Sequence, residues 1–146
     1  MICLSGCTQP SPPVTHTPTV ALGTTSPPAT IPPAGMGTPG PTQILPPETT
    51  LIFQVASNGN TVIPLMYVSL QGGQGMNVDS QVEVTLTQPD GTAQTQYMNQ
   101  TFFTGQTLTF PCSTYQNRIE IWVVASPVGK TKVYDKIVPF QSINPY

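Results

Sequence analysis

The stretch Val82-Glu83-Val84-Thr85-Leu86-Thr87 decides the fold class of this chain. Apolar and polar residues alternate strictly through it, so successive side chains point to opposite faces of a β-strand that is buried on one face. Residues 119–125 repeat the alternation, with Glu120 on the polar side. No window from residue 48 onward keeps the i, i+3, i+4, i+7 apolar spacing of an amphipathic helix. The C-terminal part of the chain is therefore predicted to be all-β.

Turn sequences divide this part into about seven strands. Pro89-Asp90-Gly91 separates two alternating runs, because proline presets the first turn position and glycine accepts a positive φ. Residues 104–106 and 127–130 are predicted to close two more hairpins. Short strands at this spacing predict an antiparallel, Ig-like β-sandwich over residues 48–146, with a small closed barrel as the alternative. The remaining predicted strands are residues 51–55, 62–70, 95–103, 107–110 and 131–140.

Composition changes sharply at residue 47. The chain has 146 residues and 18 prolines, and 12 of those prolines lie in the first 47 residues, which contain no charged or aromatic residue. Such a segment cannot bury enough apolar surface to offset the entropy of ordering its backbone. Residues 8–47 are therefore predicted to form an extended Pro/Thr-rich stalk of polyproline II character, whose Thr and Ser residues suit O-glycosylation. A low-complexity extension without a role is the alternative.

The first seven residues carry a targeting motif. Leu4-Ser5-Gly6-Cys7 resembles the lipobox of prokaryotic lipoproteins, in which an aliphatic residue and two small residues precede the cysteine that receives lipid. The resemblance implies that Cys7 is lipidated and becomes the first mature residue, with Cys3 removed. Six residues precede Cys7, fewer than the basic and apolar regions of a signal peptide require, so residues 1–7 are interpreted as a truncated signal with a lipobox. An accidental match is the alternative.

Five stretches of the folded part follow one another in a distinctive order. They are residues 68–73 (Val-Ser-Leu-Gln-Gly-Gly), 82–85 (Val-Glu-Val-Thr), 89–92 (Pro-Asp-Gly-Thr), 118–124 (Arg-Ile-Glu-Ile-Trp-Val-Val) and 132–136 (Lys-Val-Tyr-Asp-Lys). Together they resemble the C-terminal β-domain of archaeal type IV pilin-like and related surface proteins. The resemblance covers about residues 49–140, and Gln71 stands where that domain usually has histidine. The long apolar N-terminal helix of a pilin has no counterpart here. The resemblance implies a fold and a surface setting rather than an activity.

The residues able to do chemistry are few. Cys112 has no nearby cysteine or histidine, so it is predicted to be a small buried apolar residue, with an intermolecular disulfide as the alternative. The single histidine, His16, lies in the predicted stalk, so no nucleophile–base pair is assembled and no enzyme is predicted. Asn99-Gln100-Thr101 is a sequon that predicts N-glycosylation of Asn99.

Polar and aromatic residues in the predicted sandwich favour structural roles. Asp79 and Glu83 share a strand neighbourhood, but hard cations need more oxygen ligands than this spacing supplies. The glycine-rich residues 72–75 precede no helix, so they do not form a phosphate loop. Trp122 lies on the face of its strand opposite Ile121 and Val123, so it is predicted either on the outer face or packed under a loop, and packing in the core is favoured. No metal or cofactor is expected.

The order of lipobox, stalk and sandwich predicts a non-catalytic lipoprotein on the extracellular face of the cell membrane. Its expected role is structural or adhesive, with contacts to envelope or neighbouring surface proteins, including copies of itself. A net charge of −2 excludes the basic footprint of a nucleic-acid-binding protein. The alternative is a subunit of an extracellular filament or sheath, in which the uncharged N-terminal segment packs between neighbouring subunits.

Overall fold

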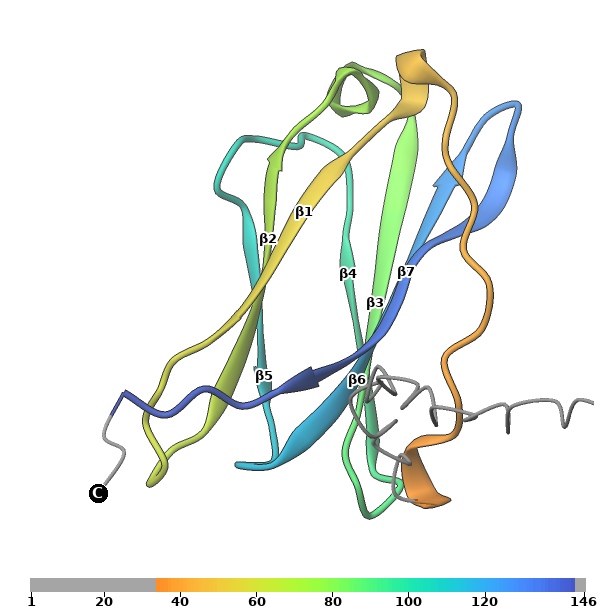
Figure 1. Cartoon of the computed structure of the whole chain (residues 1–146). Coiled ribbons are helices and arrows are strands. Elements are labelled where there is room, and N and C mark those ends of the chain that lie inside the picture. Colours follow the sequence, from red (N-terminus) through yellow and green to blue (C-terminus); the bar gives the residue numbers. More distant parts are fainter. Residues whose placement is uncertain (1–33, 144–146) are drawn as a thin grey trace, which may run out of the picture. The chain divides into compact units, whose positions relative to one another are not determined.

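Seven strands form two antiparallel sheets in the computed structural model of the chain, which describes residues 34–143 (Figure 1). The strand order is β1-β2-β5 in one sheet and β4-β3-β6-β7 in the other. The two sheets have separate edges, so the predicted β-sandwich is confirmed and the closed barrel is wrong. The strands are β1 (Ile52–Ser57), β2 (Leu65–Gly72), β3 (Ser80–Thr87), β4 (Ala93–Met98), β5 (Thr107–Pro111), β6 (Gln116–Ala125) and β7 (Gly129–Pro139).

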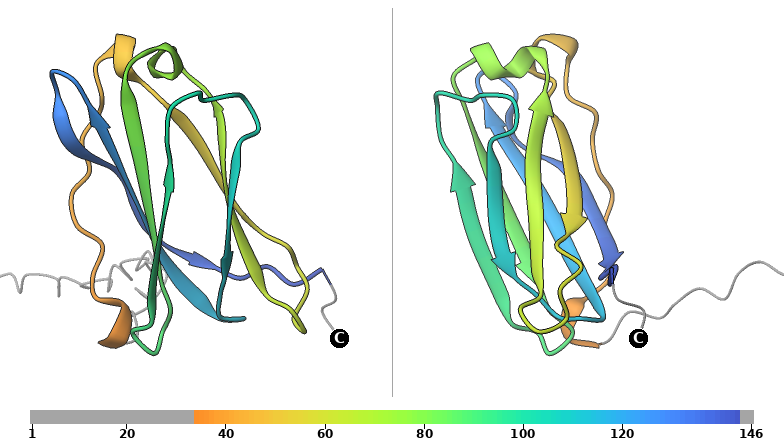
Figure 2. Two further views of the ribbon diagram at one scale, coloured as in Figure 1. Left: turned by 180° about the vertical axis from the view of Figure 1, so that it is seen from behind. Right: turned by 90° about the vertical axis from the view of Figure 1, so that its left-hand side faces the viewer.

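The core lies between the two sheets, which appear as two layers in the right-hand view of Figure 2. Strand β6 has one face in this core and one face outside it. Every second residue from Asn117 to Ala125 is buried, and the residues between them are not. Strand β3 buries alternate residues in the same way. The fully buried side chains of the two layers include Met66, Val68, Leu70, Phe110, Val82, Val84, Leu86, Met98, Ile119, Ile121 and Val123.

Strand β4 pairs with β3 and not with β5. In the constant-type immunoglobulin arrangement the fourth strand lies beside the fifth, so the division of strands differs here. Residues 104–106 therefore close no hairpin, contrary to the sequence prediction, because the chain crosses there from one sheet to the other. Gly105 N–H donates to Leu70 O (2.7 Å) on β2 instead. The edges of β4 and β5 are bridged by side chains, as where Gln96 Nε2 donates to Thr109 O (2.7 Å).

Strand β2 begins at Leu65, three residues later than the predicted start at residue 62. Asparagine side chains hold the preceding loop in a non-extended conformation, since Asn60 Oδ1 accepts from Val62 N (2.9 Å) and Asn58 Nδ2 donates to Ile63 O (2.7 Å). Val62 is consequently 86% exposed. The polar loop geometry overrides the β-propensity of these aliphatic residues.

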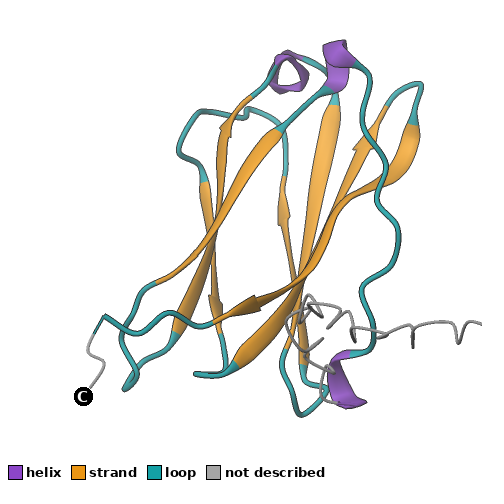
Figure 3. Ribbon diagram, viewed as in Figure 1, coloured by secondary structure: helices purple, strands orange, loops and turns teal. Residues whose placement is uncertain are grey.

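Residues 34–50, called the strap, run along the sandwich from one end to the other (Figures 1 and 3). The strap is mostly irregular, with the short 3-10 helices η1 (Ala34–Met36) and η2 (Pro47–Thr49) at its two ends; a third, η3 (Gln74–Asn77), follows β2. Met36 and Leu45 are buried to 1% and 7% exposure. The prediction that residues 34–47 belong to a free stalk is therefore wrong: their apolar side chains are part of the folded unit. The rest of the predicted stalk, and Cys3, Cys7 and His16, lie outside the described residues.

Glycines allow close backbone packing at both ends of the strap. A Cβ on Gly35 would lie 2.5 Å from Pro89 O and 2.6 Å from Gly91 N, so only glycine lets η1 pack on the β3–β4 turn. At the other end, a Cβ on Gly75 would lie 2.4 Å from Thr49 O. The glycine-rich run between β2 and β3 therefore serves close backbone packing.

Candidate binding face on the four-stranded sheet

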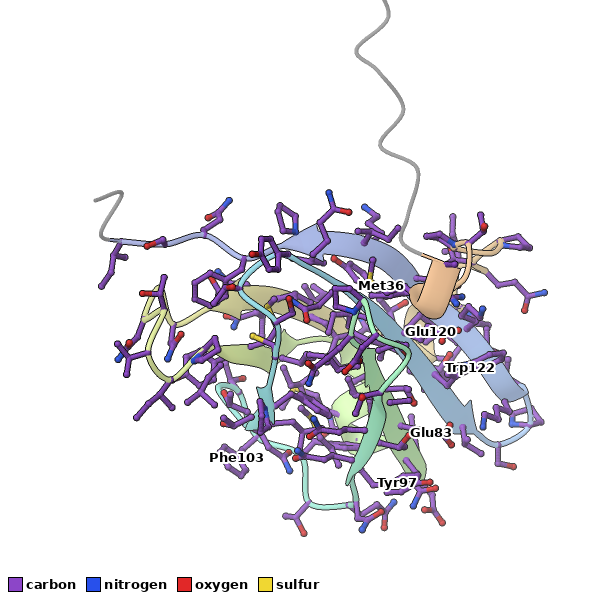
Figure 4. The ribbon with its side chains drawn as sticks, turned by 90° about the horizontal axis from the view of Figure 1, so that it is seen from below. Met36, Glu83, Tyr97, Phe103, Glu120 and Trp122 are labelled. Atoms are coloured by element: carbon purple, nitrogen blue, oxygen red, sulfur yellow. The ribbon has the colours of Figure 1, made fainter. Side chains whose placement is uncertain are left out.

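The outward-pointing side chains of β4, β3, β6 and β7 form what we call the outer face. Direct cross-strand pairing places one row of residues across all four strands, because Glu83 pairs with both Tyr97 and Trp122, and Trp122 pairs with Lys132. Figure 4 shows Glu120, Trp122, Glu83 and Tyr97 along one side of the molecule, with Phe103 away from them. The row places an aromatic ring on each side of a carboxylate.

Trp122 lies on the outer face, so the prediction that it packs in the core is wrong. Ile121 and Val123 occupy the buried positions of β6, which turns the residue between them outward. Two ammonium groups lie over its ring, with Lys132 Nζ at 5.0 Å and Lys130 Nζ at 5.2 Å from the centroid. These cation–π contacts fix the indole on the sheet surface instead of in the core.

Charge is concentrated on the same face. Of the ten charged residues in the chain, six belong to this face, three of each sign, whereas β1, β2 and β5 carry none. The ion pairs join Lys130 to Glu83 (2.8 Å), Lys132 to Glu120 (3.1 Å), Arg118 to Glu120 (3.2 Å), and Asp135 to Arg118 and Lys132 (2.8 Å each). The face is therefore polar and locally neutral.

Asp135 is the centre of this network. Its side chain has 0% exposure, and its Oδ2 accepts from Gly40 N (2.8 Å) of the strap as well as from Lys132 Nζ. Burial raises the pKa of Asp135, but the hydrogen bonds from Arg118, Lys132 and Gly40 N outweigh it and hold the pKa at about 2. Arg118 also donates to Met36 O (3.0 Å), so the ionised network fixes the strap to the sheet.

Two grooves border the row of aromatic residues. The first, of about 410 Å³, lies between the strap and the β6–β7 hairpin, and is lined by Pro41, Gln43, Trp122, Lys130 and Lys132. The second, of about 540 Å³, is lined by Asp79, Ser80, Gln81, Asn99, Gln100, Val124 and Ser126. Gln81, Val124 and Lys130 are successive cross-strand partners on the outer face, so the two grooves belong to one continuous surface.

Asn99 is exposed at the end of β4, where an attached sugar has room. Its Oδ1 accepts from Gln81 Nε2 (2.7 Å), which places the sequon asparagine at the edge of the outer face. Thr101, the third residue of the sequon, has a φ of 71°. Glycosylation of Asn99 stays a prediction.

The other residues that the sequence singles out have structural roles. Cys112 is buried at 7% exposure, as predicted, and desolvation raises the pKa of its thiol to about 11. Asp90 stabilises the β3–β4 turn by accepting from Thr92 N (2.8 Å), and this hydrogen bond lowers its pKa. Glu83 pairs with Lys130 instead of sharing a site with Asp79. Within residues 34–143, no group of three His, Cys, Asp or Glu side chains gathers as a metal ion would require.

Sequence reasoning missed Tyr97, Lys130 and Lys132 as parts of a surface. Alternation within each strand gives a signal for which side chains point outward, but it does not say which strands are neighbours. The three residues come from β4 and β7, at opposite edges of the sheet, so only the strand order brings them to one face.

Comparisons with known proteins identified no family model and no curated protein that matches the chain. Among residues 34–143, none of the helices is long and apolar enough to span a membrane.

Proposed function

We propose that this protein is a non-catalytic cell-surface lipoprotein, of an archaeal or other prokaryotic cell, that displays a β-sandwich as a binding module. The lipid anchor is Cys7, and residues 8–33 form the tether between the anchor and the folded unit. The binding role is carried by one observation: six charged and two aromatic residues share the outer face, while the other sheet has no charged residue.

The anchor is tested by mass spectrometry of the protein isolated from its native membranes. We expect an N-terminal peptide that starts at Cys7 and carries the mass of a diacylglyceryl group. Cys7→Ser should release the protein from the membrane fraction, whereas Cys3→Ser, a matched change four residues away, should leave it membrane-bound. An unmodified Cys7 in a chain that retains residues 1–6 would refute the anchor.

We also propose that Asn99 carries an N-linked glycan, because its side chain is exposed and the sequon is complete. Glycopeptide mass spectrometry of the native protein should find the sugar on Asn99, and Asn99→Gln should remove it. Gln100→Ala keeps the sequon and should leave the modification unchanged. An unmodified Asn99 in native material would show that the sequon is not used.

A filament or sheath subunit is the second candidate, and one observation favours it. Four apolar side chains stand 62–86% exposed at one end of the sandwich: Val62, Ile63, Tyr115 and Ile143. Hydrogen bonds of the C-terminal tail, from Phe140 N to Tyr115 O (2.6 Å) and from Ile143 N to Gly59 O (3.2 Å), hold them together. Light scattering over a range of protein concentrations separates the two functions, because a filament subunit should assemble and a tethered module should stay monomeric.

A further inference from the structure

Strand β1 is the least covered strand of the sandwich. Its six residues alternate between exposed and half-buried and none is buried, whereas each of the other strands buries at least one residue. Its inward side chains Phe53 and Val55 pack against the core but stay partly open to solvent, and Ile52 is 56% exposed. Within residues 34–143 the strand has one neighbour in its sheet, β2, so its other edge is free (Figure 1).

The alternation of hydrogen bonds shows which backbone groups occupy this free edge. Asn58 N donates to Leu65 O (2.9 Å), so in the antiparallel register every second residue back along β1 bonds to β2. The N–H and C=O groups of Phe53 and Val55 therefore point away from β2. No other segment of the described residues pairs with them. They offer donors and acceptors to a further strand.

The other three sheet edges are protected. Strands β4 and β5 face each other, and glutamine amides donate to backbone carbonyls of β5 at 2.7–3.4 Å. Strand β7 has lysines, a terminal proline and an extra residue, Val133, and Gln43 of the strap bonds to it. Lysine, proline, bulges and covering segments are the devices that prevent strand addition. From Phe53 to Ser57, β1 keeps a regular register and has neither charge nor proline.

We propose that β1 pairs with β1 of a second copy of the chain in an antiparallel, two-fold arrangement. A register that sets Gln54 opposite Gln54 of the second copy brings Phe53 opposite Val55, so the outward N–H and C=O groups of both residues are bonded. The same register sets the exposed Ile52 opposite Ala56 of the second copy, whose small side chain leaves room for it. The two three-stranded sheets then form one continuous sheet.

A second copy suits this edge because the edge is complementary to itself. Strands β1, β2 and β5 have no charged residue, so two of these sheets meet without like-charge repulsion. The inference rests on the second candidate function, a filament or sheath subunit, and specifies one of its contacts. A two-fold contact joins only two copies, so growth of a filament also needs a second surface, for which the apolar end at Val62, Ile63, Tyr115 and Ile143 is available.

Charge variants of Gln54 test the pairing, because this exposed side chain would lie opposite its own copy. The full chain carrying Cys3→Ser and Cys7→Ser is followed by sedimentation velocity over a range of concentrations. Gln54→Lys and Gln54→Glu each set two like charges against each other and should weaken association by about tenfold or more, whereas an equimolar mixture of the two should restore it. Gln71→Lys makes the same change on β2, away from the two-fold axis, and should associate like the parent chain.

A disulfide tests the register directly. Facing residues at a non-hydrogen-bonded position of antiparallel strands have Cα atoms about 4.5 Å apart, which a disulfide can span. Gln54→Cys in the same background should therefore form a disulfide-linked dimer under mild oxidation. Gln71→Cys, which is also exposed, should stay largely monomeric. Cys112 is buried and should not interfere.

The outcomes separate the pairing from the filament. A chain that stays monomeric at every concentration would refute both and leave the β1 edge to a different protein. Assembly that charge at Gln54 does not change, or equal crosslinking of Gln54→Cys and Gln71→Cys, would refute the pairing and leave the filament candidate standing. Dimers that Gln54→Lys disrupts but that never grow further would support the pairing and refute the filament.

Discussion

At the residue scale, Asp135 combines complete burial of its carboxylate with full ionisation. Three donors from two strands and the strap surround it: Arg118, Lys132 and Gly40 N. A buried charge is tolerated when its partners satisfy it, and removal of one partner leaves the others buried without compensation. The strap is thus attached through a group whose protonation would weaken three contacts together.

The low pKa of Asp135 predicts loss of stability in acid. Its folded pKa of about 2 lies below the ordinary value of 3.8, so the stabilisation is complete above about pH 5 and is lost as the pH falls towards 2. We expect this group to contribute about 2 kcal/mol to the free energy of unfolding at pH 7. Urea denaturation at pH 7, 4 and 2 measures it.

The matching variant is Asp135→Asn, which should lower the free energy of unfolding at pH 7 by about 3 kcal/mol and flatten its dependence on pH. Asp79→Asn makes the same change at an exposed carboxylate and should leave both unchanged. An equal pH dependence in Asp135→Asn and the unmodified chain would contradict the role of this carboxylate.

Cys112 is predicted to be unreactive in the folded protein. Desolvation raises the pKa of its thiol to about 11, so little thiolate is present at pH 8, and the side chain is buried. In a chain carrying Cys3→Ser and Cys7→Ser, the thiol reagent DTNB should react with Cys112 slowly in buffer and rapidly in denaturant. Fast labelling in buffer would show that the thiol is accessible.

At the element scale, alternation predicted the strands well where one face is buried. Strand β3 lies where Val82, Val84 and Leu86 predicted it, and β6 where Ile119 and Ile121 did. The sheet to which β4 belongs was not predictable, because pairing is decided by packing between residues far apart in the sequence. Alternation also places Trp122 opposite its apolar neighbours on β6, and the error was to favour packing in the core over the outer face.

The close packing of Gly35 on the β3–β4 turn gives a prediction at the scale of the element. Gly35→Ala would place a Cβ 2.5 Å from Pro89 O, and the strain should lower the free energy of unfolding by about 1–3 kcal/mol. Gly40→Ala is the matched control in the same strap, because its Cβ would have 3.5 Å of clearance to Lys132 Nζ. The difference between the urea midpoints of the two variants measures how much the close packing of Gly35 contributes to stability. Equal midpoints would mean that η1 packs less closely on the β3–β4 turn.

At the scale of the whole molecule, the folded unit is longer than composition indicates. Residues 34–47 have neither charge nor aromatic rings, and composition alone predicts that they belong to the stalk. They are ordered because the sandwich supplies what they lack: a buried position for Met36, a place in the core for Leu45, and an edge of β7 where Gln43 N donates to Lys132 O (2.8 Å). Composition indicates whether a segment can fold by itself, whereas the strap folds against the sandwich.

Truncation tests this boundary. A chain of residues 34–146 should unfold at the same urea midpoint as the full chain, whereas residues 48–146 should lose about 3 kcal/mol with the burial of Met36 and Leu45. The comparison uses heteronuclear NMR spectra to verify that both fragments are folded. If the shorter fragment is as stable as the longer one, the strap contributes nothing to folding.

The strap also determines how the molecule responds to tension. A force applied to the chain before residue 34 would act first on the packing of Gly35 against the β3–β4 turn. It would then act in turn on three hydrogen bonds of the strap, which join Met36 to Arg118, Gly40 to Asp135 and Gln43 to Lys132. Only after residue 50 would the load reach β1 and the core. Because these contacts follow one another along the chain, they would break one after another, so a pulling force would have to detach the strap before it could unfold the sandwich.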